Sequence, residues 1–155
     1  NLQETPASAN PSGHSMIDGA TELKDLDKTE ANKKLVEGFV HDVLMGENMD
    51  ALPSYYDGNN YIQHNPGIAD GLDGLGKALA DMAAAGLKMV YYKNHKILGE
   101  GNFVLSVSEG EFCDRHVAFY DLFRVKNGKI AEHWDAIEDI PAEDKWLNKN
   151  GKFGF

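Results

Sequence analysis

The stretch that most constrains the fold is RHVAFYDLFRVKNGKIAEHWDAIEDI, residues 115–140. Two runs rich in β-branched and aromatic residues flank Asn127-Gly128, and an Asn-Gly pair in this setting is a strong signal for a β-hairpin. The second run also carries Glu132, His133 and Asp135. Ionisable groups on a strand that otherwise favours burial indicate a functional site near this end of the chain.

Two hairpin registers fit the sequence, and they differ in what faces Asp135. If Asn127 and Gly128 alone form a primed turn, Lys126 pairs with Lys129 and Asp135 lies opposite Tyr120.

In the alternative register, Gly128 adopts a left-handed conformation as a bulge after a type I turn. Asp135 then lies opposite Phe119, and His133 lies opposite Asp121. We favour this bulged register. Both registers place His133 and Asp135 on one face, because strand side chains alternate with a period of two.

The bulged register also predicts the composition of the two faces. The polar face is expected to hold Asp121, His133 and Asp135. The apolar face, which we expect to lie on the outside of the sheet and to support a homodimer, is expected to hold Tyr120, Leu122, Ile130 and Trp134.

Composition excludes several classes of protein. The chain has 155 residues, 42% of them hydrophobic, and a formal charge of −10. This length suits one domain, and the negative charge argues against a nucleic-acid partner and against binding to anionic membranes. No apolar run is long enough to span a bilayer. Cys113 is the only cysteine, so an intramolecular disulfide is impossible, and the compartment is left open with the cytoplasm favoured.

The order of the expected elements indicates an α+β domain. Residues 1–26 lack apolar periodicity and are expected to form a flexible N-terminal arm, and residues 27–155 a single domain with a C-terminal tail that folds back. Helices are expected over 29–45, 49–56 and 75–85, and strands over 61–66, 88–98 and 102–112, before the hairpin. A strongly curved sheet wrapped around the N-terminal helices would enclose a pocket.

The segments YIQHNP (61–66), SEG (108–110) and FYDLFRVKNGKIAEHWD (119–135) resemble the SnoaL-like polyketide cyclases of the nuclear-transport-factor-two-like superfamily. QHNP narrows the resemblance to uncharacterised members that are labelled as aldol-condensation enzymes. The resemblance implies a cone-shaped α+β barrel with a mixed, mostly antiparallel sheet, a homodimer formed through the outer face of the sheet, and no cofactor. In the cyclases, an aspartate on the last strand moves a proton beside a carbonyl, and Asp135 is the best match for it.

Asp135 and His64 are the candidate catalytic residues. Asp135 is either a solvated carboxylate at the end of a strand or a base whose pKa is raised by an apolar pocket. His64 is either an ordinary strand residue or, if it shares the cavity with Asp135, a donor to a developing enolate oxygen.

The candidate substrate-binding residues surround these two positions. They are Tyr61, Asn65, Glu109, Phe119, Asp121, His133 and Trp134. His133 and Asp121 are alternatively a structural ion pair across the hairpin, and the three aromatic residues are core residues of which one or two should line the pocket. His64, His133, Asp135 and Glu109 are suitable metal ligands by type, but no helical HExxH motif is present, so no metal site is expected.

The sequence therefore predicts a cofactor-independent enzyme of the lyase, isomerase or cyclase type. It would act on a small apolar substrate by proton transfer α to a carbonyl. The alternative is a non-catalytic module of the same fold that binds a small ligand or serves assembly.

Overall fold

The computed structural model describes residues 5–155 and contains a mixed five-stranded sheet in the order β1-β5-β4-β3-β2. The strands are β1 (Ile62–Gln63), β2 (Met89–Glu100), β3 (Phe103–Phe112), β4 (Arg115–Lys126) and β5 (Lys129–Asp139). The four long strands form an antiparallel meander, and β1 is a short parallel edge strand on β5. The α+β class and the curled, cone-like sheet expected from the sequence are confirmed.

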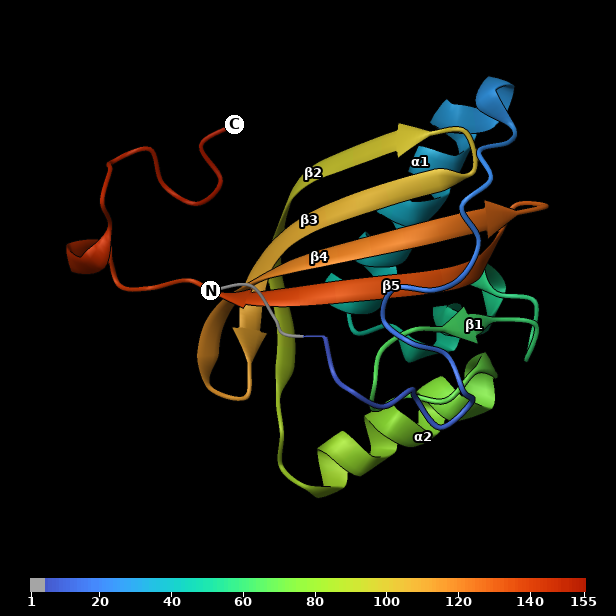
Figure 1. Cartoon of the computed structure of the whole chain (residues 1–155), viewed down its shortest axis with the longest axis horizontal. Coiled ribbons are helices and arrows are strands. Elements are labelled where there is room, and N and C mark those ends of the chain that lie inside the picture. Colours follow the sequence, from blue (N-terminus) through green and yellow to red (C-terminus); the bar gives the residue numbers. More distant parts are fainter. Residues whose placement is uncertain (1–4) are drawn as a thin grey trace.

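Except for the short segment 143–145 in the C-terminal tail, the helices lie on one side of this sheet (Figure 1). They are α1 (Thr29–Phe39), which continues as the π-helical turn η2 (Val40–Met45), and α2 (Gly71–Ala84), with short 3-10 segments η1 (Leu26–Lys28), η3 (Met49–Tyr55) and η4 (Glu143–Lys145). In Figure 1, α1 lies behind the sheet and α2 below its β1 end. The second helix begins four residues earlier than predicted. Within residues 5–155, no helix is long and apolar enough to cross a bilayer.

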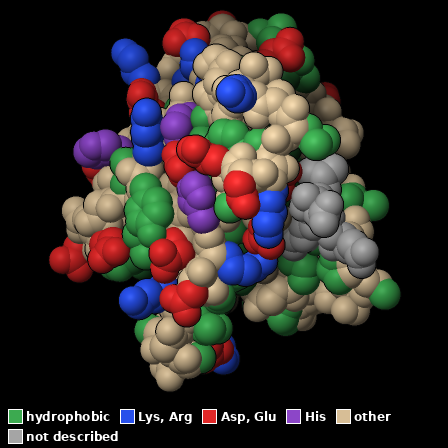
Figure 2. Space-filling view, turned by 90° about the vertical axis from the view of Figure 1, so that its left-hand side faces the viewer, with side chains coloured by type: hydrophobic (Ala, Val, Ile, Leu, Met, Phe, Trp, Pro, Cys, Tyr) green, Lys and Arg blue, Asp and Glu red, His purple; other side chains and the backbone are tan. Residues whose placement is uncertain are grey.

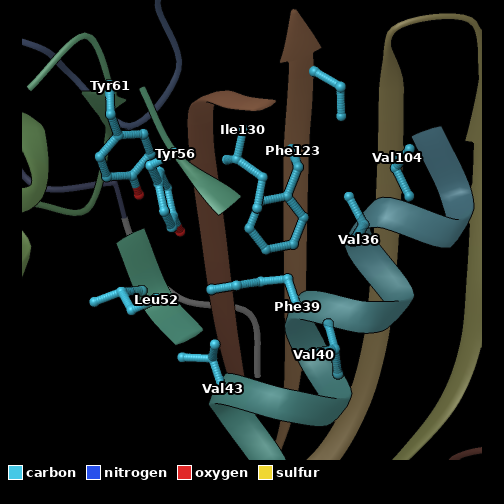
Figure 3. Packing of buried hydrophobic residues seen from close by; sticks show 11 residues of the cluster. Val36, Phe39, Val40, Val43, Leu52, Tyr56, Tyr61, Val104, Phe123 and Ile130 are labelled. Atoms are coloured by element: carbon cyan, nitrogen blue, oxygen red, sulfur yellow. The ribbon is translucent and has the colours of Figure 1, made fainter. Parts of the chain in front are cut away.

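The core is formed where α1 packs on the inner face of the sheet. Val36, Phe39, Val40 and Val43 recur at helical spacing and are all buried. Figure 3 shows the Phe39 side chain pointing at Phe123 of β4, and the two rings meet edge to face at 5.6 Å. Phe39 and Phe123 also line the cavity described below, so this packing forms part of its wall.

The β4–β5 turn has the primed geometry. Asn127 and Gly128 both have positive φ, at 52° and 71°, and Lys126 pairs with Lys129. The favoured bulged turn is therefore wrong at this position. An Asn-Gly pair accommodates two successive left-handed residues at low cost, which explains the preference.

A bulge nevertheless occurs, two residues beyond the turn. Val125 pairs with Ile130, whereas Arg124 pairs with Glu132, so Ala131 is an extra residue in β5. Neither predicted partner of Asp135 is correct, because the extra residue brings Asp121 opposite Asp135 instead.

The bulge also reverses the direction of Ile130. Ile130 is fully buried in the core and is not part of the outer face, contrary to the sequence prediction. Beyond the bulge, the predicted alternation holds: Asp121, His133 and Asp135 all line the inner cavity.

Residues 5–25 contain no regular helix or strand but pack against the sheet. This segment, blue in Figure 1, runs along the β1–β5 edge. The Asn10 amide donates to the carbonyl oxygens of Gln63 and Ile68 at 2.7 and 2.9 Å, and the Trp134 indole donates to Asp18 O at 2.8 Å. The sequence predicted a flexible arm over 1–26; residues 1–4 lie outside the described residues, and the rest is held by these long-range contacts.

The C-terminal tail folds back on the outer face of the sheet. The Phe153 ring stacks on His95 of β2 at 3.9 Å, and Lys152 forms an ion pair with Glu138 of β5. The Lys96 ammonium lies 4.5 Å from the centre of the Phe155 ring. The tail thus covers part of the surface that the sequence analysis assigned to a homodimer.

Candidate functional site

A cavity of about 520 Å³ lies between the inner face of the sheet and the helices. Most of its wall is aliphatic or aromatic, including Phe39, Leu79, Met82, Phe119 and Ile137. Its main polar cluster comes from the strand side of the cavity. This cluster consists of Gln63 of β1, Asn65 just after β1, Asp121 of β4, and His133 and Asp135 of β5, whereas Glu47 and Asp81 come from the helical side.

The Gln63 carboxamide fixes the position of His133. Its Oε1 atom accepts the backbone N–H groups of His64 and Asn65, each at 2.9 Å. Because backbone N–H groups only donate, the atom that faces them must be the oxygen. The His133 Nδ1 atom lies 3.0 Å from the same oxygen and must therefore carry a proton.

The other nitrogen of His133 faces a carboxylate. His133 Nε2 lies 3.0 Å from Asp121 Oδ1, and the Tyr91 hydroxyl donates to Asp121 Oδ2 at 3.2 Å. Burial by itself would lower the pKa of His133, but the hydrogen bond and charge of Asp121, with the charge of Asp135, outweigh it and raise this pKa above 6.5. With acceptors at both ring nitrogens, His133 is best described as an imidazolium paired with Asp121.

Asp135 is the least satisfied polar group in the cavity. Its Oδ2 atom accepts the Asn65 amide at 2.7 Å, while Oδ1 is buried and has no hydrogen-bond partner among residues 5–155. Burial raises the pKa of Asp135 above 3.8; the His133 charge and the Asn65 hydrogen bond lower it, and the Asp121 charge raises it. The net result is a raised pKa, which makes Asp135 a stronger base than an ordinary aspartate.

Two tyrosine hydroxyls extend the network along the cavity wall. The Gln63 amide donates to the Tyr61 hydroxyl at 2.8 Å, so the Tyr61 proton points elsewhere. The Tyr56 hydroxyl is the next group along the wall and lines the cavity, so it can donate to a ligand. Figure 3 shows the two hydroxyls side by side.

His64 does not share the cavity with Asp135. Its side chain points to the opposite side of β1, where it is fully buried and stacks on Trp134 at 4.7 Å. His64 Nε2 donates to Glu132 Oε1 at 2.8 Å. The expectation that it faces Asp135 is corrected, because residues 63 and 64 of an extended segment point in opposite directions.

Glu109 and Trp134 also lie outside the cavity. Glu109 is on the outer face of β3, between His95 and His116, with 2.7 Å to each ring nitrogen. Figure 2 shows histidine and acidic side chains next to one another on the face of the molecule near the C-terminal tail. Trp134 lies under residues 14–20. The alternating pattern of the strand places Glu109 and Ser108 on opposite faces of the sheet. It does not show which of the two faces is the inner one.

The remaining sequence-derived candidates line the cavity. They are Tyr61, Asn65, Phe119, Asp121, His133 and Asp135. Sequence reasoning missed Gln63, Tyr56 and Tyr91 as parts of the polar network. The QHNP motif contains Gln63 and could have drawn attention to it; the two tyrosines carry no local signal, because tyrosine is also a common core residue.

Among residues 5–155, two groups of side chains have the composition of metal ligands. One is Asp121, His133 and Asp135 in the cavity, and the other is His14, Asp18 and His64 on the outer side of β1. In the cavity group, both nitrogens of His133 already face protein acceptors. The cavity group has a single imidazole, which is paired with Asp121, whereas the outer group offers two imidazoles.

The fold places the chain among proteins with a cone-shaped α+β structure. A proposed ketosteroid isomerase from Kribbella flavida has a TM-score of 0.61 and 12% identity, covering 81% of this chain and 95% of that chain. A SnoaL-like polyketide cyclase from Agrobacterium tumefaciens has a TM-score of 0.53 and 12% identity, and the match covers 69% of this chain and 91% of that chain. An LEH-like epoxide hydrolase from M. tuberculosis has a TM-score of 0.52 and 23% identity, and the match covers 70% of this chain and 83% of that chain.

The SnoaL-like domain matches residues 36–133, and the chain belongs to this family. The comparison with curated proteins found no significant match. At these identities the structural likeness establishes the fold and not the reaction.

The raised pKa of Asp135 predicts a pH-dependent effect of Asp135→Asn on stability. A raised pKa means that the folded state binds the proton more tightly than the unfolded state, so this stabilisation is present below 3.8 and is lost as pH rises through the folded-state pKa. We expect the variant to gain stability relative to the parent protein as pH rises from about 3.5 to 7. Urea unfolding at several pH values measures this, with Asp114→Asn, in an exposed turn, as the matched control. A difference independent of pH would contradict a destabilised buried carboxylate.

Proposed function

We propose that this protein is a cofactor-independent enzyme that transfers a proton at a carbon α to a carbonyl group. The observation that carries this proposal is the Asp135 carboxylate, which has one unpartnered oxygen in a largely apolar cavity. A general base needs a raised pKa and a place at the wall of the substrate cavity, and Asp135 has both.

The developing negative charge on the carbonyl oxygen requires a hydrogen-bond donor. The sequence analysis assigned this role to His64, which lies on the other side of β1. We assign it instead to the Tyr56 hydroxyl, which ends the Gln63–Tyr61–Tyr56 series and lines the cavity. A donor positioned in advance stabilises an enolate more than the initial carbonyl, since the charge develops only in the transition state.

The cavity supports a small, mostly apolar and uncharged substrate. Its described lining contains no Lys or Arg, whereas Glu47 and Asp81 lie at its wall together with the buried carboxylates. An anionic substrate would therefore meet like charges, because the His133 imidazolium is already paired with Asp121. The cyclase and the proposed isomerase among the structural neighbours are consistent with carbonyl chemistry in this type of cavity.

Replacing the base should abolish proton transfer without unfolding the protein. We expect Asp135→Asn to slow α-proton exchange about 100- to 10,000-fold, because the amide cannot act as a base. NMR in D2O, with a panel of neutral cyclic and aromatic ketones, measures the exchange, and circular dichroism checks the fold. Exchange at the parental rate in the variant would remove Asp135 from the mechanism.

If no ketone exchanges with the parent protein, the alternative is a module that binds an apolar ligand without chemistry. Titration of the Asp135 carboxyl distinguishes the enzyme from the binding module. An Asp135 pKa near 6 or above by carbon-13 NMR favours catalysis, and a value near 4 favours binding alone.

The Tyr56 assignment predicts a loss of transition-state stabilisation. We expect Tyr56→Phe to lower the maximal exchange rate about 100-fold or more while leaving substrate affinity nearly unchanged. Tyr55→Phe is the matched control, since the Tyr55 hydroxyl donates to Asp42 at the surface. Equal effects of the two substitutions would contradict a specific role for Tyr56.

A homodimer through the outer face of the sheet is also a proposal. Of the residues expected to form this face, Tyr120 and Leu122 are only partly buried, whereas Ile130 lies in the core and Trp134 under residues 14–20. We expect sedimentation to show a dimer at micromolar concentration and Leu122→Glu to dissociate it, since burying an unpaired charge is unfavourable. A monomeric parent protein would exclude this interface.

A further inference from the structure

On the outer side of β1, the N-terminal segment approaches His64 closely. The approach depends on Gly19, which has a φ of 109°. A Cβ atom at this position would lie 2.4 Å from Glu132 Oε1, 2.7 Å from Trp134 Cζ2 and 2.8 Å from His64 Nε2. Because only glycine fits here without rearrangement, the position of residues 14–20 is specified by the sequence.

The environment of His64 fixes which nitrogen carries a proton. Nε2 lies 2.8 Å from Glu132 Oε1, and a carboxylate can only accept, so Nε2 donates. The other oxygen of Glu132 is paired with Arg124 at 2.6 Å. Since Arg124 already neutralises this buried carboxylate, His64 does not need a positive charge to do so.

The second nitrogen of His64 faces two further electron-rich atoms. Nδ1 lies 2.7 Å from the Ser15 carbonyl oxygen and 2.9 Å from Asp18 Oδ1. A neutral His64 that donates from Nε2 has a lone pair at Nδ1, and this lone pair would repel both oxygens. Either a second proton or a cation must lie between these atoms.

Like His64, His14 has one ring nitrogen held by a carboxylate. Its Nε2 atom lies 3.1 Å from Asp70 Oδ2, and the other oxygen of Asp70 accepts the backbone N–H of Gln63 at 3.0 Å. This leaves Nδ1 of His14 as the available nitrogen. One ligand atom from each of His14, Asp18 and His64 lies within 4.8 Å of the other two.

We propose that His14, Asp18 and His64 bind a divalent transition-metal ion, with the Ser15 carbonyl oxygen as a further ligand. Two imidazoles, one carboxylate and a neutral oxygen suit Zn²⁺ or Fe²⁺ better than Mg²⁺ or Ca²⁺. Each histidine has its other nitrogen held by a carboxylate, which is the usual outer environment of metal-bound histidine. The His14 and Asp18 side chains are 33% and 50% exposed, whereas His64 is inaccessible, so an ion can enter from solvent.

This site is separate from the cavity in which we place the reaction. The ion would join residues 14–18 to β1 and hold the N-terminal segment in place. Its occupancy does not depend on whether Asp135 acts as a base.

The test is metal binding by the full chain after treatment with a chelator. We expect calorimetry to show one Zn²⁺ per chain, and Co²⁺ to give the visible absorption of a tetrahedral site. Asp18→Asn should weaken Zn²⁺ binding at least 100-fold. Asp70→Asn removes the carboxylate partner of His14, while its amide oxygen can still accept the Gln63 N–H group, and should weaken Zn²⁺ binding about 10- to 100-fold. His41→Ala, at an exposed histidine beside Asp42, is the matched control and should bind like the parent protein.

Asp135→Asn distinguishes the two clusters. If it weakens Zn²⁺ binding and Asp18→Asn does not, the ion is in the cavity and the proposal is wrong. Absence of stoichiometric binding in a folded parent protein would also overturn it, and the cluster would then be an ion-paired contact of a protonated His64.

Discussion

The Gln63 side chain is the interaction on which the site depends. One oxygen accepts N–H groups from His64, Asn65 and His133, so it shapes the backbone after β1 and orients the imidazole at the same time. The amide nitrogen of Gln63 donates to the Tyr61 hydroxyl and thereby directs the Tyr61 proton away from Gln63. A hydrocarbon of equal size would leave buried N–H groups without an acceptor, which is unfavourable even before any chemistry is considered.

The β5 strand shows how far a sequence pattern can predict such a site. Asn127-Gly128 predicts the turn because the pair accommodates two left-handed residues. The period of two then predicts that His133 and Asp135 share a face, and the cavity contains both. The bulge at Ala131 could not be predicted, since alanine has no conformational requirement that marks it. The position of the bulge is set by packing, because the bulge allows both Ile130 and His133 to face the interior of the protein.

The direction of His64 could not be predicted for a related reason. The β1 strand has only two residues, and both faces of it are buried, by the cavity on one side and by residues 14–20 on the other. A strand buried on both faces shows no alternation from which an inner face can be inferred. Tyr56 and Tyr91 lie 65 and 30 residues before Asp121 in the sequence. Helical and strand periodicities do not extend over such separations, so they could not predict that these tyrosines join the network. The fold and the pair on β5 were predictable, whereas the hydrogen-bond partners required the three-dimensional arrangement.

Asp121 and Asp135 lie directly opposite each other in the sheet, yet their environments assign them different roles. Asp121 has the nearer imidazole nitrogen and the Tyr91 hydroxyl, so its charge is compensated by close donors. Asp135 has one amide donor for two oxygens and feels Asp121 as a like charge. The poorly compensated Asp135 carboxylate therefore holds a proton more readily than an ordinary aspartate and can act as a base. Exchanging the two roles would require His133 to rotate away from Gln63, and the three hydrogen bonds at that oxygen oppose such a rotation.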